Sequence, residues 1–214
     1  FMNKLLYVIV AIIAGAVGFF VFQKATILPQ PEHALYYKEV REIKPFQLTD
    51  HHNQAFTKEQ LADKWSWIFL GYTSCPDVCP TTLQELNFVY DDLKAISANT
   101  QILLVSADPS RDTPEKLAQY IAYFNEEFIA LTADHGVLFP FARNLGLMYA
   151  INEPEDNSVD KDYYLVDHSA SLVLVNPQGN IAAIFKHRQE LGVLPKIDGE
   201  KLISDFATIV KLAE

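Results

Sequence analysis

The chain has 214 residues, of which 50% are hydrophobic, 21% charged and 12% aromatic, and its formal net charge is −10 at pH 7. This composition is typical of a globular domain and excludes a disordered, collagen-like or disulfide-dense chain. Acidic residues outnumber basic ones 27 to 17, and no Lys/Arg block interrupts the sequence, so we expect no nucleic-acid partner.

The first predicted element is a membrane-spanning helix. Residues 5–22 include no charged side chain and lie between Lys4 and Lys24. A helix of that length rises by about 27 Å, which is enough to cross a hydrocarbon core. A cleaved signal peptide would have a shorter apolar region followed by an A-x-A-like site, so we interpret the run as an uncleaved anchor. Because the chain beyond Lys24 is acidic, the positive-inside bias places the N-terminus in the cytoplasm and the remainder outside.

Three parts are expected along the chain. Residues 1–24 form the membrane anchor, and residues 25–45, which include three prolines, form a juxtamembrane linker. Residues 46–214 form one folded domain, which is long enough to bury a core of its own.

Within that domain the hydrophobic pattern alternates between strand and helix periods. Strands are expected at 46–50, 54–56, 67–70, 102–105, 128–131, 171–175 and 181–185. Helices are expected around Leu61 and at 83–96, 113–124, 135–145 and 202–212. This order predicts an α/β fold with a thioredoxin-like mixed sheet flanked by helices. The acidic segment 152–164 breaks the pattern and is expected to be a surface loop or a flap over a site.

The two cysteines of the chain lie at one corner of this predicted fold. Cys75 and Cys79 belong to the stretch GYTSCPDVCP, between a buried strand and an amphipathic helix. We expect Pro80 to be the first helical residue. The Cys79 sulfur would then lie near the positive end of the helix dipole, which favours a thiolate.

Three chemistries fit such a pair: a structural disulfide, a redox dithiol or a metal site. Redox proteins of the thioredoxin type use C-x-x-C, whereas this spacing is C-x-x-x-C and leaves room for an ion between the sulfurs. Soft thiolates select Cu(I) or zinc. Two sulfurs are an incomplete site for either metal, and a closed zinc site needs four protein ligands.

A histidine is the expected third ligand, and His168 has the most suitable position. It precedes the predicted strand 171–175, which in a thioredoxin-like sheet enters beside the cysteine corner. The other five histidines have simpler interpretations as solvated surface or as a helix cap: His33, His51, His52, His187 and, at a helix start, His135.

Three motifs together resemble the Sco/SenC family of membrane-anchored copper proteins, and the resemblance covers most of residues 45–210. The motifs are GYTSCPDVCP at 71–80, VSADPSRDTPEKL at 105–117 and VDHSASLVLVNPQG at 166–179. The resemblance implies a thioredoxin-like domain that faces the periplasm from the inner membrane. It also implies copper ligands at Cys75, Cys79 and His168. Asp77, Asp108, Arg111 and Asp112 match the family motifs as well, but no ligand role is carried over to them.

Two functions follow from this resemblance. Family members assemble the dinuclear copper centre of cytochrome c oxidase, either by delivering copper or by reducing the acceptor's cysteines. The first hypothesis is therefore a copper metallochaperone, and the second is a thiol-disulfide oxidoreductase with Cys75 and Cys79 as its catalytic dithiol. Expected partners are the copper-accepting subunit of cytochrome c oxidase, a copper donor and a thiol reductant. A peroxidase of the peroxiredoxin type is set aside because Tyr72 stands where that motif requires threonine.

Overall fold

The structure, a computed structural model, describes residues 2–26, 29–152, 164–187 and 196–213. They fall into two compact units, and Pro31–Ala213 forms the larger one. The other unit contains helix α1 (Met2–Thr26), in which Lys4–Phe22 is long and apolar enough to cross a membrane.

The larger unit is built on one eight-stranded mixed sheet. In spatial order its strands are β1 (Leu35–Tyr36), β10 (Ile181–Phe185), β9 (Leu172–Val175), β4 (Trp65–Gly71), β5 (Thr100–Ser106), β6 (Ile129–Thr132), β2 (Gln47–Asp50) and β3 (Ala55–Thr57). Strands β4, β5 and β6 run parallel, whereas β9 pairs antiparallel with β4 and β2 pairs antiparallel with β6. Every residue of β4 and β5 is buried, as expected for central strands that are covered on both faces.

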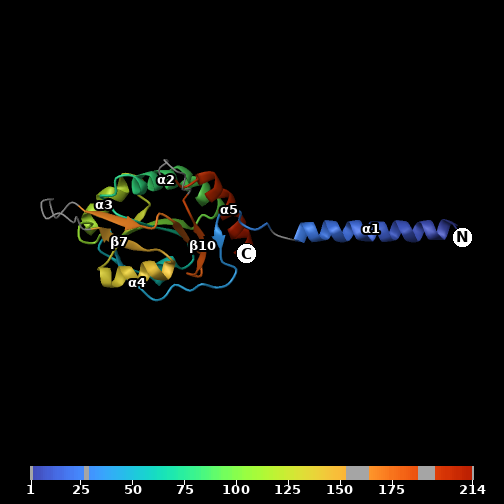
Figure 1. The fold of residues 1–214 in the computed structure, drawn as a ribbon, viewed down its shortest axis with the longest axis horizontal. Coiled ribbons are helices and arrows are strands. Elements are labelled where there is room, and N and C mark those ends of the chain that lie inside the picture. Colours follow the sequence, from blue (N-terminus) through green and yellow to red (C-terminus); the bar gives the residue numbers. More distant parts are fainter. Residues whose placement is uncertain (1, 27–28, 153–163, 188–195, 214) are drawn as a thin grey trace. The chain divides into compact units, whose positions relative to one another are not determined.

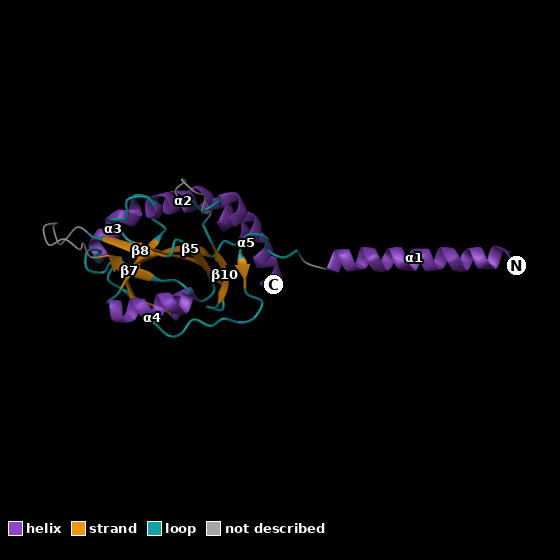
Figure 2. Cartoon of the chain, viewed as in Figure 1, coloured by secondary structure: helices purple, strands orange, loops and turns teal. Residues whose placement is uncertain are grey.

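Helices cover both faces of this sheet. Helices α2 (Val78–Ile96), α3 (Pro114–Ala122) and α5 (Gly199–Ala213) lie along one face, and α4 (His135–Leu145) lies along the other (Figures 1 and 2). A short 3-10 helix, η1 (Lys58–Leu61), follows β3. Trp67 of β4 packs edge-on against Phe206 of α5 with ring centroids 5.3 Å apart, which ties the terminal helix to the centre of the sheet. The architecture is the predicted thioredoxin-like α/β fold.

A separate two-stranded ribbon was not predicted. Strand β7 (Tyr149–Asn152) pairs antiparallel with β8 (Leu165–His168), so that Tyr149 lies directly opposite His168. Most of the acidic segment expected as a loop or flap, residues 153–163, lies outside the described residues. The ribbon matters for function because β8 ends at His168.

Part of the expected linker is folded onto the larger unit. Leu35–Tyr36 forms edge strand β1 against β10, and Ile43 is buried in the core. The buried Asp205 carboxylate of α5 accepts hydrogen bonds from the backbone N–H groups of Glu32, His33 and Ala34 at 2.6–3.0 Å. In the structure, residues 31–45 belong to the same compact unit as the sheet.

Candidate metal centre

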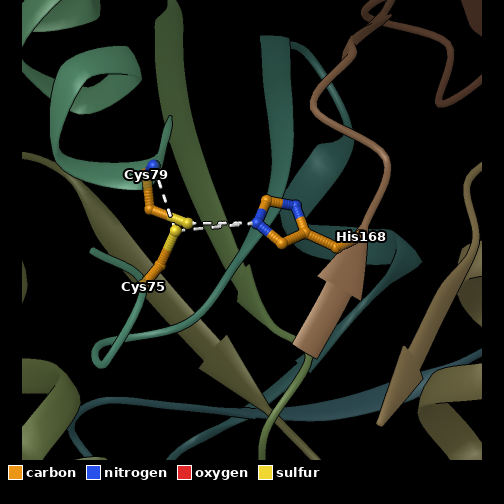
Figure 3. A group of neighbouring side chains, drawn as sticks. All are labelled: Cys75, Cys79 and His168. Atoms are coloured by element: carbon orange, nitrogen blue, oxygen red, sulfur yellow. Dashed lines mark hydrogen bonds between the residues drawn. The ribbon is translucent and has the colours of Figure 1, made fainter. Parts of the chain in front are cut away.

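Three elements bring Cys75, Cys79 and His168 together. Cys75 lies in the turn that leaves β4, Cys79 is the second residue of α2, and His168 is the last residue of β8 (Figure 3). The imidazole Nε2 of His168 lies 3.3 Å from the Cys79 sulfur and 3.9 Å from the Cys75 sulfur. All three candidate ligand atoms lie within 4.8 Å of one another, and no disulfide joins the two cysteines. The structure thus brings together the three residues that the sequence singled out.

The backbone near the two sulfurs contacts one of them and leaves space for the other. The backbone N–H of Cys79 donates to the Cys75 sulfur at 3.4 Å. Gly71, at the end of β4, leaves room for the Cys79 sulfur, since an added Cβ at this position would lie 2.9 Å from Cys79 Sγ. The rings of Phe69 and Tyr72 meet the His168 ring edge-on, at centroid distances of 6.0 and 5.8 Å, and limit its orientation.

The two sulfurs differ in protonation. A hydrogen bond from the Cys79 thiol, supported by His168, lowers the pKa of Cys75 to about 4. Burial raises the pKa of Cys79 far above its usual range, and the charge of Cys75 adds to that shift. In the metal-free reduced protein Cys75 is therefore the thiolate and Cys79 the thiol that hydrogen-bonds to it.

This arrangement corrects two expectations about Cys79. Helix α2 begins at Val78, with Asp77 as its N-cap, so Pro80 is the third helical residue and not the first. The sequence also predicted that the helix dipole would make Cys79 a thiolate, and this was wrong because the Cys79 side chain is fully buried. The half-exposed Cys75 holds the charge instead.

Among the described residues, the remaining histidines do not join a three-residue cluster of metal-binding type. His51 Nδ1 accepts a hydrogen bond from the backbone N–H of Ala130. His135 Nδ1 lies 2.8 Å from the Tyr149 hydroxyl, which gives this ring a local hydrogen bond. His51 and His187 both depart from the surface interpretation, because burial lowers the pKa of each ring, and within the described residues the buried Nδ1 of His187 has no hydrogen-bond partner.

The three ligand atoms have the spacing of a small soft-metal site. With metal–sulfur bonds of about 2.3 Å and metal–nitrogen bonds of about 2.0 Å, bound sulfur and nitrogen atoms lie roughly 3.5–3.7 Å apart. The observed 3.3 and 3.9 Å bracket that separation. Two thiolates and one imidazole select soft or borderline metals over hard cations. No fourth His, Cys or carboxylate ligand joins the cluster in the part of the chain that the structure describes, unlike a closed zinc site.

Fold and site together define a thioredoxin-like protein with a candidate Cys2His soft-metal site. A sequence model of the SCO1/SenC family matches residues 36–196. The chain is 36% identical over 168 residues to a protein of Stutzerimonas stutzeri described as copper-binding, covering 75% of this chain and 79% of that protein. It is 34% identical over 155 residues to mitochondrial SCO2 of Saccharomyces cerevisiae, where the match spans 72% of this chain but 50% of the longer relative. The chain therefore belongs to the SCO1/SenC family.

Solved structures of relatives support the same assignment. The copper-bound structure of Arabidopsis thaliana ScoI superposes with a TM-score of 0.68 and 28% identity, and covers 79% of this chain and 98% of that one. Copper-bound yeast Sco1 superposes with a TM-score of 0.67 and 26% identity, covering 79% and 88% of the two chains.

Proposed function

We propose that this protein is a membrane-anchored copper metallochaperone whose ligands are Cys75, Cys79 and His168. The observation that carries the proposal is the convergence of two free sulfurs and one imidazole nitrogen within 4.8 Å, on a fold whose relatives include copper-bound structures. Helix α1 is the anchor in this proposal, and the folded unit faces the periplasm from the inner membrane. This orientation rests on the family resemblance.

The chemistry of the three ligands suits a copper carrier. Two thiolates and one imidazole form a three-coordinate site for Cu(I), and Cu(II) adds an oxygen ligand such as water. Binding requires both cysteines to be deprotonated, so the proton that the Cys75–Cys79 pair shares is released when copper enters. The His168 ring, limited by Phe69 and Tyr72, offers Nε2 to the metal without a large rearrangement.

The proposed recipient is the copper-accepting subunit of cytochrome c oxidase, and this part rests on the family resemblance. This part of the proposal is tested by measuring copper transfer. The reduced, Cu(I)-loaded full chain in detergent is mixed with the metal-free soluble domain of that subunit, and the two are then separated and analysed for copper. We expect copper to move to the acceptor when its cysteines are reduced. Retention of all copper by the donor, with an acceptor that takes up free copper, would contradict the proposal.

A second function, thiol-disulfide exchange, is favoured by the state of the cysteine pair. Cys75 is a half-exposed thiolate and Cys79 is a buried thiol beside it, which are the attacking and resolving positions of a dithiol reductant. Cys75 would attack a client disulfide and Cys79 would then attack the mixed disulfide. The client would leave with one thiol, which takes the Cys79 proton, and one thiolate, which takes a proton from water. Two electrons pass to the client, and the pair becomes a disulfide that a thiol reductant must restore.

The two functions differ in their need for His168. Copper binding requires the imidazole, whereas disulfide exchange requires the two sulfurs. The variant His168→Ala should therefore lose copper binding and keep the ability to reduce a client disulfide. If His168→Ala binds copper as tightly as the wild type, the three-ligand site is wrong and the oxidoreductase becomes the better account.

A further inference from the structure

The motif at residues 105–117 contributes no candidate ligand to the Cys75, Cys79 and His168 site. The structure places its two aspartates, Asp108 and Asp112, in the loop that follows β5, and both side chains are completely buried. Burying a carboxylate is costly unless it is well hydrogen-bonded. Arg111 pairs with Asp108 and Lys116 with Asp112, and each carboxylate also accepts a hydrogen bond from a segment that leads to a candidate ligand.

Asp112 holds the cysteine turn. One carboxylate oxygen accepts the backbone N–H of Thr73 at 2.9 Å, and the other accepts the Thr73 hydroxyl at 2.5 Å. Thr73 lies two residues before Cys75, whose own N–H donates to the Tyr72 carbonyl at 3.2 Å. The path of the chain between β4 and Cys75 is therefore fixed by a side chain 39 residues away in sequence.

Asp108 holds the strand that carries the histidine. Its carboxylate accepts the Tyr164 hydroxyl at 2.6 Å and also pairs with Arg111. The Arg111 guanidinium lies over the Tyr164 ring, 3.6 Å from its centroid. Tyr164 immediately precedes β8, and His168 ends that strand.

The Ser106 hydroxyl is hydrogen-bonded to both Asp108 and Asp112. Ser106 Oγ donates to Asp112 at 2.7 Å and accepts the backbone N–H of Asp108 at 3.0 Å. The turn that carries Cys75 and the residue that precedes strand β8 are thus hydrogen-bonded to two carboxylates of one segment of seven residues, 106–112.

We propose that the loop 106–112 positions the copper site by holding the Cys75 turn through Thr73–Asp112 and the His168 strand through Tyr164–Asp108. These are positioning residues and contact no metal in this account. The loop keeps the sulfurs and the imidazole at binding distance before copper arrives, so less ordering is needed on binding. The inference rests on the proposed copper site and extends it. Groups that orient metal ligands in this way typically contribute about 10–100-fold to metal affinity.

The cysteine half is tested with a matched pair of substitutions in the full chain in detergent. Thr73→Val removes the hydroxyl donor to Asp112 at nearly constant volume, and Thr73→Ser keeps it. We expect Cu(I) affinity, measured by competition with a chromophoric chelator, to fall by about tenfold in Thr73→Val and to stay near the wild-type value in Thr73→Ser. Without copper, the Cys75–Cys79 disulfide should form less readily against glutathione in Thr73→Val, because a looser turn lowers the effective concentration of the two thiols.

The Tyr164–Asp108 hydrogen bond, next to the strand that carries His168, is tested by a second substitution. Tyr164→Phe removes the hydroxyl donor to Asp108 and retains the ring beneath Arg111. We expect weaker copper binding and a weaker nitrogen hyperfine contribution in the Cu(II) spectrum, with the disulfide equilibrium unchanged. The control Thr113→Ala removes the N-cap of α3, whose hydroxyl accepts the Lys116 N–H at 3.3 Å, and should lower stability while leaving copper binding and the disulfide equilibrium unchanged.

The possible results separate this inference from the proposed function. If the wild type binds copper and both Thr73→Val and Tyr164→Phe bind it equally well, the positioning role is wrong and the copper site stands. If Thr113→Ala weakens copper binding as much as they do, the effect is general destabilisation and the inference fails. If the wild type binds no copper, the proposed function fails. If, in addition, the disulfide equilibrium is unchanged in Thr73→Val, the proposed role of the Thr73–Asp112 hydrogen bond fails as well.

Discussion

At Cys79 two electrostatic effects oppose each other. A helix N-terminus stabilises a negative charge by about 0.3–1 kcal/mol. Complete burial of an ionisable group shifts its pKa by up to about 3–5 units, and one unit corresponds to about 1.4 kcal/mol. Burial is therefore several times larger, and Cys79 remains a thiol while Cys75 ionises. An electrophile should therefore react first with Cys75 in the reduced protein.

The first prediction concerns the pH dependence of that attack. In the reduced, metal-free protein, the rate of Cys75 alkylation by iodoacetamide should stay nearly constant between pH 5.5 and 8, because its pKa of about 4 lies below that range. An ordinary thiol, with a pKa near 8.5, would lose about tenfold in rate per pH unit. In Cys79→Ala, which lacks the donor to Cys75, the rate should fall as the pH is lowered. A wild-type rate that falls tenfold per unit would contradict the assignment.

The second prediction concerns the space that Gly71 leaves for the Cys79 sulfur. In Gly71→Ala the new Cβ would lie 2.9 Å from Cys79 Sγ and 3.0 Å from the Phe69 ring. We expect a loss of about 1–3 kcal/mol in unfolding free energy from overpacking, together with weaker Cu(I) binding. Urea unfolding and copper competition measure the two effects. Gly136→Ala is the control, because nothing lies within 4 Å of its Cβ position in α4, and it should be neutral or slightly stabilising.

Among the elements, α5 and the chain that follows the membrane helix are joined by one side chain. Asp205, which is 2% exposed, accepts three backbone N–H groups from residues 32–34. Asp205→Ala would leave these donors without their acceptor, so we expect a loss of at least about 2 kcal/mol in unfolding free energy. The exposed Asp92→Ala in α2 should change it by less than about 0.5 kcal/mol. Equal effects of the two substitutions in urea unfolding would show that the three hydrogen bonds contribute little.

The hydrophobic pattern predicted the central strands of the main sheet because burial on both faces leaves continuous apolar runs, as in β4 and β9. It missed β8, whose four residues carry one buried side chain and two exposed ones. It also missed β1, which has two residues and owes its pairing to the edge of β10. Such short, half-exposed strands are defined by their partners in the fold rather than by local sequence.

The candidate ligands were predictable because their residue types carry the chemistry and their motifs lie at element ends. Their protonation was not predictable, since it depends on the burial of Cys79. The contacts of Asp112 with Thr73 were also beyond the pattern, because they join residues 39 positions apart. The motif around Asp112 was visible, but its hydrogen-bond partners were not.

At the scale of the whole molecule, we predict that helix α1 holds the protein in a membrane. The full chain should remain in the membrane fraction after alkaline carbonate washing, because Lys4–Phe22 spans the hydrocarbon core in this account. Deletion of residues 2–26 should release the protein into the soluble fraction without changing its copper affinity, because the candidate ligands all lie in the unit Pro31–Ala213. Immunoblotting of the fractions measures the first effect. A full chain extracted by carbonate would contradict the anchor.

In the proposed site, one copper ion binds Cys75, Cys79 and His168. The most direct test is Cu(I) affinity and stoichiometry, measured anaerobically by chelator competition on the wild type and on Cys75→Ser, Cys79→Ser and His168→Ala. The exposed His52→Ala serves as a matched histidine control. We expect one tightly bound copper in the wild type and in His52→Ala, and a loss of affinity of tenfold or more in each of the three ligand variants. Equal affinity in the wild type and His168→Ala would contradict it.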